Sequence, residues 1–416
     1  MGVIAIGNNA LNSTAATAHT GTIAIGHDAL TAVNSADATG TVAIGYQAGL
    51  AITSGQESVL IGRQAGQTLT TGDANTAVGH YALYHNVTGN YNTAIGRGAG
   101  ARFLQSNSTA LGYYAGHYAS GSQNTFIGSE AGKGGTSSAP YSSGTVNVAV
   151  GYQALTAFTT ALHNVAIGHS AMKDNTQGNY NTAVGNNAMR ENTTGGANTA
   201  LGYAAGFSLN GGTYNVLIGN GAGYNLAGAS NCILIGDEAG TNINNANSNG
   251  TVAIGHEALK SMVAYPANTA IGHKAGTAMT SNIGNTIIGY DAFKSADYFE
   301  DYNVVIGYNA GAAINHANAD DNILVGYNAG YGGVNALRQC VAIGSNALDA
   351  TGGNALTGAV AIGYNALTAL TSGGGNVAIG YENSKAITTG TENTSVGSSA
   401  NYNSTGNYNT TLGYQS

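Results

Sequence analysis

The chain has 416 residues, of which only 7% are charged, and its formal net charge is −8. Its 11 lysines and arginines disfavour nucleic acid as a partner, because binding it requires clustered basic side chains. A hydrophobic content of 43% argues against disorder, and the absence of any run of 18 apolar residues argues against a membrane span.

One short phrase, close to Asn-Thr-Ala-Ile-Gly-Tyr-x-Ala-Gly, recurs along the whole sequence. Its glycine aligns at 24 positions, and 12 of the 23 spacings between these glycines are 17 residues, within a range of 16 to 23. A fixed period of this length is typical of a solenoid, in which each repeat buries its apolar face against its neighbours. Because no shift in composition divides the chain, we predict one elongated repeat domain over residues 1–416, without separate caps.

Each repeat contains a short apolar segment just before its glycine. The residue directly before the glycine is always Ile, Val or Leu, and Val, Ile or Thr stands two positions earlier, as in Ile167 and Val165. This alternation predicts a strand with both side chains on one face, while the residue between them, usually Ala as at Ala166, faces the other way. Both faces are apolar, so we expect both to be covered, with Ile167 in a buried ladder.

The chain is expected to turn at the glycine. Ala follows three residues later in 22 of 24 repeats, and the next position is usually Gly, Leu, Met or Phe. We interpret this part as a second short strand, followed by a polar turn such as residues 70–72. The predicted fold is therefore all-β, a β-solenoid or parallel β-roll of about 24 coils with two short strands each. At a rise of about 4.8 Å per coil, it would form a rod of roughly 115 Å.

The fourth residue before the glycine is Asn in 15 repeats, including Asn75 and Asn164. Stacked Asn side chains can hydrogen-bond along the axis as a ladder. The same column holds both cysteines, Cys232 and Cys340, which lie six coils apart. That separation, roughly 29 Å at the expected coil rise, is beyond the reach of a disulfide. We therefore predict two free thiols.

The position after the repeat glycine forms a column of rings, Tyr in ten repeats and His in five. In stacked coils it would be a continuous stripe. Such a stripe is either a binding track for sugars or another surface, or a stacking ladder that supports the turn. The tyrosines of this predicted tyrosine stripe are Tyr46, Tyr113, Tyr152, Tyr203, Tyr290, Tyr308, Tyr327, Tyr364 and Tyr381.

Only two clusters of charged or titratable residues are candidates for a metal site. His256 and His273 occupy this ring column in adjacent coils, but no Cys, Asp or Glu of the column completes a four-ligand set. The carboxylates Asp301 and Asp320 share another column, and Arg338 follows them one coil later. Calcium could bridge the carboxylates, whereas an ion-pair ladder closed by Arg338 needs no metal. We favour this axial ion ladder and expect no cofactor.

The phrase Val-Ala-Ile-Gly at residues 42–45, 165–168 and 252–255 resembles the head repeats of trimeric autotransporter adhesins of the Hep/Hag type, and similar phrases in tail-fibre-like proteins. The resemblance extends over the full length. It implies a left-handed parallel β-roll, a trimer, and an adhesive function at the cell surface. The chain differs in its longer period, and its sequence shows no neck, coiled-coil stalk or membrane anchor of that family.

No motif of a catalytic serine, a zinc protease or a phosphate-binding loop occurs, and the longest spacing, residues 128–151, is rich in Ser and Gly. We therefore predict no enzymatic activity. We expect a structural subunit of a fibre or filament that is extracellular, at a cell surface or in a virion. Because the repeat is already in phase at residues 4–7 and still at residues 410–413, we expect chains to join end to end.

Side-by-side or trimeric association is a second expected contact, since columns of small Ala residues would permit close approach. The alternatives to a fibre are an adhesin or tail-fibre rod that binds a host surface or a glycan, and an ice-binding surface made of threonine ladders.

Overall fold

In a computed structural model, the structure describes residues 2–12, 20–35, 39–297, 299–332, 337–350, 355–402 and 406–416. The chain is an all-β parallel β-solenoid of about 23 turns with a period of about 17 residues, as the glycine spacing predicted. It divides into two compact units, Met1–Gly211 and Gly212–Ser416. Both units are built from the same repeat.

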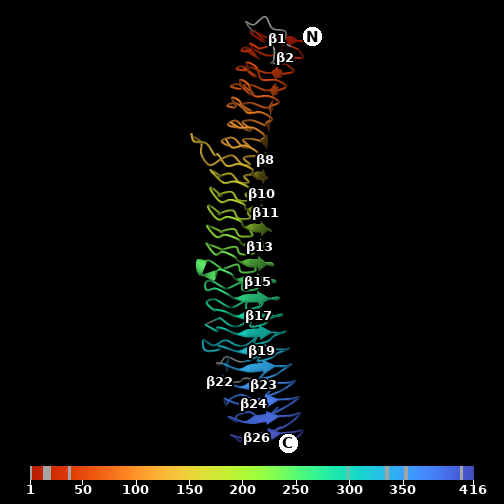
Figure 1. Ribbon diagram of the computed structural model, residues 1–416, viewed down its shortest axis with the longest axis vertical. Helices are drawn as coiled ribbons and strands as arrows, with labels where there is room; N and C mark the ends of the chain where they lie inside the picture. Colours follow the sequence, from red (N-terminus) through yellow and green to blue (C-terminus); the bar gives the residue numbers. More distant parts are fainter. Residues whose placement is uncertain are drawn as a thin grey trace. The chain divides into compact units, whose positions relative to one another are not determined.

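The first unit has one three-residue strand per coil, and each strand pairs in parallel with that of the next coil (Figure 1). The pairing joins equivalent positions, so that Val42 lies opposite Val59 and Ile44 opposite Ile61. The strands of the first unit are β1 (Ile4–Ile6), β2 (Ile23–Ile25), β3 (Val42–Ile44), β4 (Val59–Ile61), β5 (Thr76–Val78), β6 (Thr93–Ile95), β7 (Thr109–Leu111), β8 (Thr125–Ile127), β9 (Val148–Val150), β10 (Val165–Ile167), β11 (Thr182–Val184) and β12 (Thr199–Leu201).

The second unit repeats this arrangement and adds two short elements. A separate two-stranded sheet pairs β20 (Leu337–Arg338) with β22 (Leu356–Thr357). The only helix among the described residues is the three-residue 3₁₀ helix η1 (Ala246–Ser248). The other strands of the second unit are β13 (Val216–Ile218), β14 (Ile233–Ile235), β15 (Val252–Ile254), β16 (Thr269–Ile271), β17 (Thr286–Ile288), β18 (Val304–Ile306), β19 (Ile323–Val325), β21 (Val341–Ile343), β23 (Val360–Ile362), β24 (Val377–Ile379), β25 (Thr394–Val396) and β26 (Thr410–Leu412).

The repeat glycine is required by the close approach of successive coils. Gly45 has a φ of +135°, and a Cβ atom on it would lie 2.5 Å from the carbonyl oxygen of Gly62 in the next coil. Any other residue would collide with backbone that cannot move without breaking the coil spacing. This contact explains why the same position is glycine in all 24 repeats.

The interior of each coil is filled by alanines and by one or two larger side chains. Ala43 in the strand and Ala48 after the turn are fully buried. The position after this second alanine is Gly where a large side chain from another position fills the same space. For example, a Cβ atom on Gly132 would lie 2.1 Å from the ring of Phe126, the middle residue of β8. Where the strand residue is Ala, the same position can carry a large side chain, such as the buried Leu155.

The expected second strand after the glycine is instead a turn. In the coil that follows Gly45, residues 46–51 form turns, and Gln47 has a left-handed φ of +52°. Its backbone N–H still bonds to the carbonyl of His27 in the neighbouring coil. Turn residues therefore continue the inter-coil hydrogen bonding, and most described coils contain a single strand.

Within a single chain, only one of the two strand faces that we expected to be covered is covered. In β10, Ala166 is fully buried, whereas Ile167 on the other face is 38% exposed. The alternation recurs in most strands, where the middle residue is buried and the flanking residues are half-buried or exposed. The Ala columns therefore line the interior of the coils and are not available for contact with another chain. The outward face belongs to the β-branched residues.

The predicted Asn ladder is confirmed. The Asn164 amide nitrogen donates to the Asn147 side-chain oxygen at 3.1 Å and to the Gly178 carbonyl at 2.9 Å, while the backbone N–H of Asn181 donates to the Asn164 side-chain oxygen at 3.0 Å. Each amide thus joins three coils and satisfies buried backbone groups at the corner before the strand.

Both cysteines take Asn places in this ladder, as predicted. The backbone N–H of Cys232 donates to the Asn215 side-chain oxygen at 2.9 Å, and that of Cys340 to the Asn322 oxygen at 3.0 Å. Both thiols are buried and free, and six strand pairings separate their coils. Burial raises the pKa of the Cys340 thiol to about 11 and raises that of Cys232, so neither is a reactive thiolate.

Candidate functional surfaces

The outer strand face consists of the first and third side chains of the main-sheet strands. Among the described residues, no strand of that sheet contains a charged residue. Third-position residues more than a third exposed include Ile6, Ile95, Leu111, Ile127, Ile167 and Leu201 in the first unit, and Ile271, Ile288, Ile343, Ile379 and Leu412 in the second. At on the order of 60 Å² per coil, ten coils would expose several hundred Å², which is at the upper end for a monomer (~300–600 Å²). Each unit therefore carries an extended aliphatic surface.

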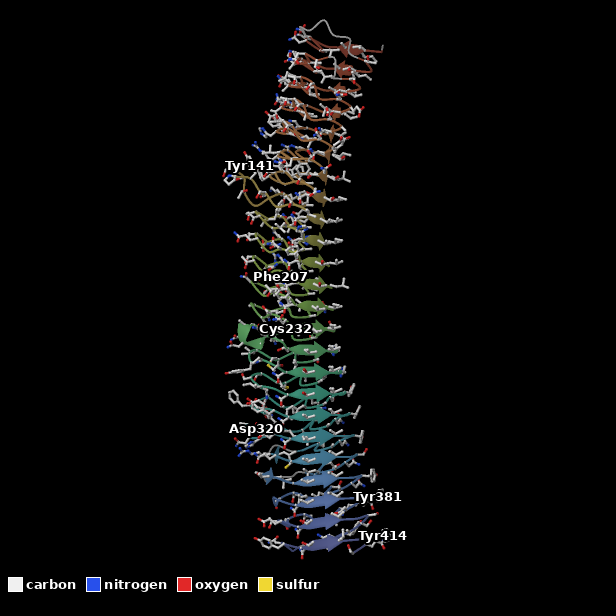
Figure 2. All side chains as sticks on the ribbon, viewed as in Figure 1. Tyr141, Phe207, Cys232, Asp320, Tyr381 and Tyr414 are labelled. Atoms are coloured by element: carbon white, nitrogen blue, oxygen red, sulfur yellow. The ribbon has the colours of Figure 1, made fainter. Side chains whose placement is uncertain are left out.

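All nine residues of the predicted tyrosine stripe lie on the surface. Where rings occupy the column in adjacent coils, they stack: the Tyr290 and Tyr308 centroids are 5.1 Å apart and their planes differ by 6°. The longest run in the described chain extends from His256 through His273, Tyr290 and Tyr308 to Tyr327. Figure 2 shows Tyr381 on the side of the coils where the strands end, and it stacks on Tyr364 at 5.4 Å.

This stacking determines what the stripe can offer to a ligand. A sugar ring binds an aromatic residue through the flat face of that residue, but in the run from His273 to Tyr327 each interior ring has both faces covered by its neighbours. Only ring edges and hydroxyl groups point to solvent. At Tyr46 one face meets His27, at 5.4 Å between centroids, and the Arg63 guanidinium also lies over the ring, at 5.8 Å. The geometry favours the stacking ladder that supports the turn.

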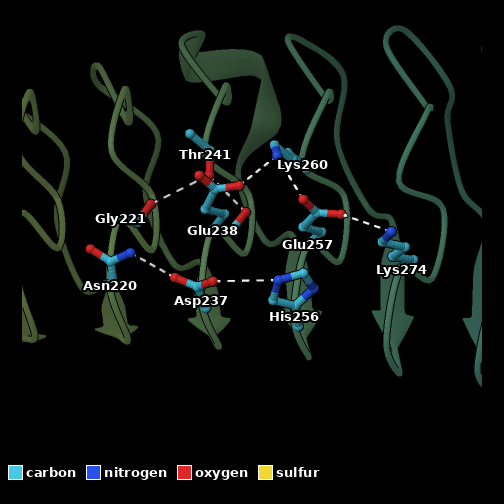
Figure 3. A network of polar contacts seen from close by, with 9 residues as sticks. All are labelled: Asn220, Gly221, Asp237, Glu238, Thr241, His256, Glu257, Lys260 and Lys274. Carbon is cyan, nitrogen blue, oxygen red and sulfur yellow. Dashed lines mark hydrogen bonds and ion pairs between the residues drawn. The ribbon is translucent and has the colours of Figure 1, made fainter.

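Beside the ring column, the second unit carries a chain of ion pairs across successive coils (Figure 3). The Lys260 Nζ atom lies 2.5 Å from a Glu238 carboxylate oxygen and 2.7 Å from one of Glu257, and the other Glu257 oxygen lies 3.6 Å from the Lys274 Nζ atom. Hydrogen bonds to both carboxylates raise the pKa of Lys260 to about 12. These groups are partly exposed, so the pairs contribute little stability, about 0–1 kcal/mol each.

The histidine pair considered as a metal site is engaged elsewhere. His256 Nε2 lies 3.4 Å from an Asp237 carboxylate oxygen, and that residue's other carboxylate oxygen accepts from the Asn220 amide at 2.7 Å (Figure 3). The imidazole rings of His256 and His273 are stacked with centroids 5.1 Å apart. Across the part of the chain that the structure describes, no group of three or more His, Cys, Asp or Glu residues could hold a metal ion.

In the predicted axial ion ladder, Asp301 and Asp320 accept hydrogen bonds from backbone N–H groups and do not form ion pairs with each other. The backbone N–H of Ile283 donates to an Asp301 carboxylate oxygen at 2.7 Å, and the N–H of Asp301 donates to Asp320 at 3.0 Å. Asn side chains accept in the same way elsewhere in this column, as Asn179 does from Leu162 at 2.9 Å. Desolvation, with a smaller effect from Asp320, raises the pKa of Asp301. These carboxylates therefore act as hydrogen-bond acceptors between coils.

Arg338 does not join this ladder. Its side chain is exposed, and among the described residues it forms no ion pair with Asp301 or Asp320. Its backbone pairs instead with Thr357 in the two-stranded sheet, where the Gly358 N–H donates to the Arg338 carbonyl at 3.0 Å. Backbone pairing thus takes over the inter-coil contact that a side-chain acceptor makes elsewhere.

The first unit contains a pocket that the repeat pattern did not predict. It has a volume of about 240 Å³ and is lined by Tyr81, Tyr84, His85, Ala101, Arg102 and His117. These residues come from the turns of three successive coils, at positions that are mostly small or polar in other repeats. A signal was present in the sequence, since residues 74–129 contain no Asp or Glu but include two Arg and three His. Aligning the repeats on their glycines hid this local excess of positive charge.

Comparison of the chain with protein-family models and with curated proteins finds no match. Among the described residues, no helix has the length and apolar character needed to cross a membrane.

Proposed function

We propose that this protein is a structural subunit that assembles into a fibre through its outer strand face, with a second copy of the chain as the partner. The half-exposed aliphatic ladder carries the proposal. It is uncharged along the main-sheet strands and recurs in both units. A surface of this kind lowers its free energy by leaving water, at about 25 cal/mol per Å² buried.

A second copy matches this surface better than an unrelated partner does. The Val165 and Ile167 side chains recur at every coil, at the strand spacing of about 4.8 Å, so ridges on one copy fit grooves on another over many coils in succession. Strand faces pack against each other about 10 Å apart when their inward side chains are apolar. The contact joins copies side by side, and an extracellular or virion location is part of the proposal, supported only by the resemblance of the repeat phrase.

The adhesin alternative depends on a binding track along the tyrosine stripe. Stacking covers the ring faces of Tyr290 and Tyr308 on both sides, which removes at these two positions the surface that a sugar ring would use. A fibre requires only regular, self-complementary faces. The fibre therefore agrees better with the geometry of the stripe.

The test compares two sets of lysine substitutions in the first unit. One variant places Lys on the outer strand face at Ile127, Ile167 and Leu201; its matched control places Lys on the tyrosine stripe at Tyr113, Tyr152 and Tyr203. We expect sedimentation velocity and electron microscopy to show assemblies of the unmodified chain and of the stripe variant, and dissociated chains of the face variant. Assemblies of unchanged size in the face variant, with folding verified by circular dichroism, would contradict the proposal.

A further inference from the structure

The geometry points to a binding site for a small sugar acid, a hydroxylated ring that bears a carboxylate, in the pocket of the first unit formed by Tyr81, Tyr84, His85, Arg102 and His117. This site is separate from the outer strand face, and the inference does not depend on self-association.

The pocket has walls built from aromatic rings. The Tyr81 and Tyr84 centroids are 4.8 Å apart at an interplanar angle of 80°, and Tyr84 meets His85 edge-on at 4.4 Å. One face of Tyr81 is covered by His80, which stacks on it at 3.9 Å between centroids. Tyr81, Tyr84 and His85 otherwise meet edge-on and do not form a continuous parallel stack such as the one that covers both faces of Tyr290 and Tyr308. The pocket volume of about 240 Å³ is below the roughly 300–1,000 Å³ of pockets for drug-sized ligands. One six-membered ring with its substituents is therefore a suitable occupant.

The positive charge of Arg102 favours an anionic ligand. Arg102 forms no ion pair among the residues that the structure describes, and the lining contains no acidic side chain. The nearby Lys133 is already paired with Glu130 at 3.2 Å. A guanidinium without a carboxylate partner, beside two imidazoles, can donate two parallel hydrogen bonds to the carboxylate of a ligand.

The electrostatic state of the histidines agrees with this unmatched positive charge. Desolvation and then the Arg102 and His117 charges lower the pKa of His85 to about 4. Desolvation also lowers the pKa of His117, with further contributions from Arg102 and Lys133. The rings are therefore neutral at pH 7, mainly because burial disfavours the charged imidazole, and the nearby positive charges add to this effect.

The hydrogen-bonding state of His117 favours a ligand with a hydroxyl group as well. His117 Nδ1 lies 2.8 Å from the Gly98 carbonyl oxygen, and a carbonyl can only accept, so Nδ1 carries the proton. The neutral ring then presents Nε2 as an acceptor, which a ligand hydroxyl can satisfy. A carboxylate for Arg102, a hydroxyl for His117 and a C–H face for the tyrosines together describe a sugar acid.

The one long insertion of the repeat contacts a residue of this site, Arg102. The loop between β8 and β9 projects from the coils of the first unit (Figure 1), and Figure 2 shows Tyr141 at its edge. The Arg102 guanidinium lies 4.6 Å from the centroid of the Tyr141 ring. This contact orients the guanidinium without using its hydrogen bonds, since a cation over a ring face leaves the N–H groups free.

The experiment is isothermal titration of the full chain at pH 7 with glucuronate, with glucose as the uncharged analogue and with acetate and inorganic phosphate as anions without a ring. The test variant is Arg102→Gln. The control is Arg190→Gln, which removes an arginine that also lies over an aromatic ring, 5.4 Å from Phe207, outside the pocket. Thermal melts establish that both variants are folded.

We expect glucuronate to bind saturably to the unmodified chain and to Arg190→Gln, and at least about tenfold more weakly to Arg102→Gln, because a hydrogen-bonded charge pair is lost. Glucose, acetate and phosphate should each bind at least about tenfold more weakly than glucuronate. The inference is overturned if glucuronate does not bind, if Arg102→Gln binds as well as the control, or if the small anions bind as well as glucuronate.

Discussion

The two faces of one strand differ in what they contact, although both are apolar. In β10, Ala166 faces the interior and is fully buried, while Val165 and Ile167 face outward and Ile167 remains 38% exposed. The smaller side chain is thus inside and the larger ones are outside, the reverse of an ordinary core. The narrow coil explains this, because Ala171 and Met172 from the same coil already occupy the interior. The inner face supplies stability, and the outer face is left in contact with solvent.

The largest expected effect comes from placing a charge on the inner face. Ala166→Asp buries an unpaired carboxylate between coils and also exceeds the space available there, so we expect a loss of stability above about 4 kcal/mol or failure to fold. Thermal denaturation monitored by circular dichroism measures the effect. A melting temperature near that of the unmodified chain would show that the interior has been assigned to the wrong face.

A smaller but still large effect is expected at the corner before the strand. Asn164→Ala removes the acceptor of the Asn181 N–H and the donor to the Gly178 carbonyl. Leaving buried groups unpaired costs about 1–3 kcal/mol each, so we expect faster amide hydrogen exchange in β10 and β11. The control is Asn179→Ala at the partly exposed acceptor of the Leu162 N–H, where water can replace the lost bond. Equal exchange in the two variants would contradict a structural Asn ladder.

Introducing an aspartate on the outer face of the same strand should have a minor effect on stability. Ile167→Asp leaves the carboxylate in contact with water, and we expect a loss below about 1 kcal/mol. The comparison with Ala166→Asp, one residue away in the same strand, is the sharpest internal test of the two faces. If both variants lose the same stability, the outer face is covered within a single chain, and the basis for association through it disappears.

The smallest expected effect is a pH dependence at the pocket. The folded-state pKa of His85 is lowered to about 4 from an unfolded value of about 6.5, so the unfolded chain binds more protons between these values. Its contribution to stability is therefore full above pH 6.5 and declines as the pH falls toward 4. His85→Gln should reduce this decline, which thermal melts at a series of pH values would measure. Identical pH profiles of the unmodified chain and His85→Gln would refute the stated protonation.

The sequence predicted the solenoid, its period, the Asn ladder and the free thiols, because each depends on one residue type recurring at a fixed spacing. It could not predict which strand face is inside, since Ala166 and Ile167 are both apolar and the width of the coil is a tertiary property. The turn after the glycine was also missed: residues such as Gln47 and Leu30 adopt left-handed backbone angles that their types do not favour. Inter-coil hydrogen bonds hold them in that conformation.

For the candidate sites too, features that recur in every repeat could be predicted from the sequence, whereas features that depend on tertiary contacts could not. The positions of the tyrosine stripe could be read from the alignment of repeats, and their exposure followed from the turn that carries them. The pocket depends on side chains that occur once, such as Arg102 and His117, and on the return of Tyr141 to Arg102. A long-range contact of that kind has no signature in a periodic sequence.

The measurement that tests association through the outer strand face most directly is the rate of thiol labelling at Ile167→Cys as a function of protein concentration. The native Cys232 and Cys340 are buried and do not compete, and Tyr152→Cys on the tyrosine stripe is the exposed control. We predict that labelling at position 167 slows as concentration rises, while labelling at position 152 stays constant. An equal, concentration-independent rate at both positions would show that no second copy covers this face.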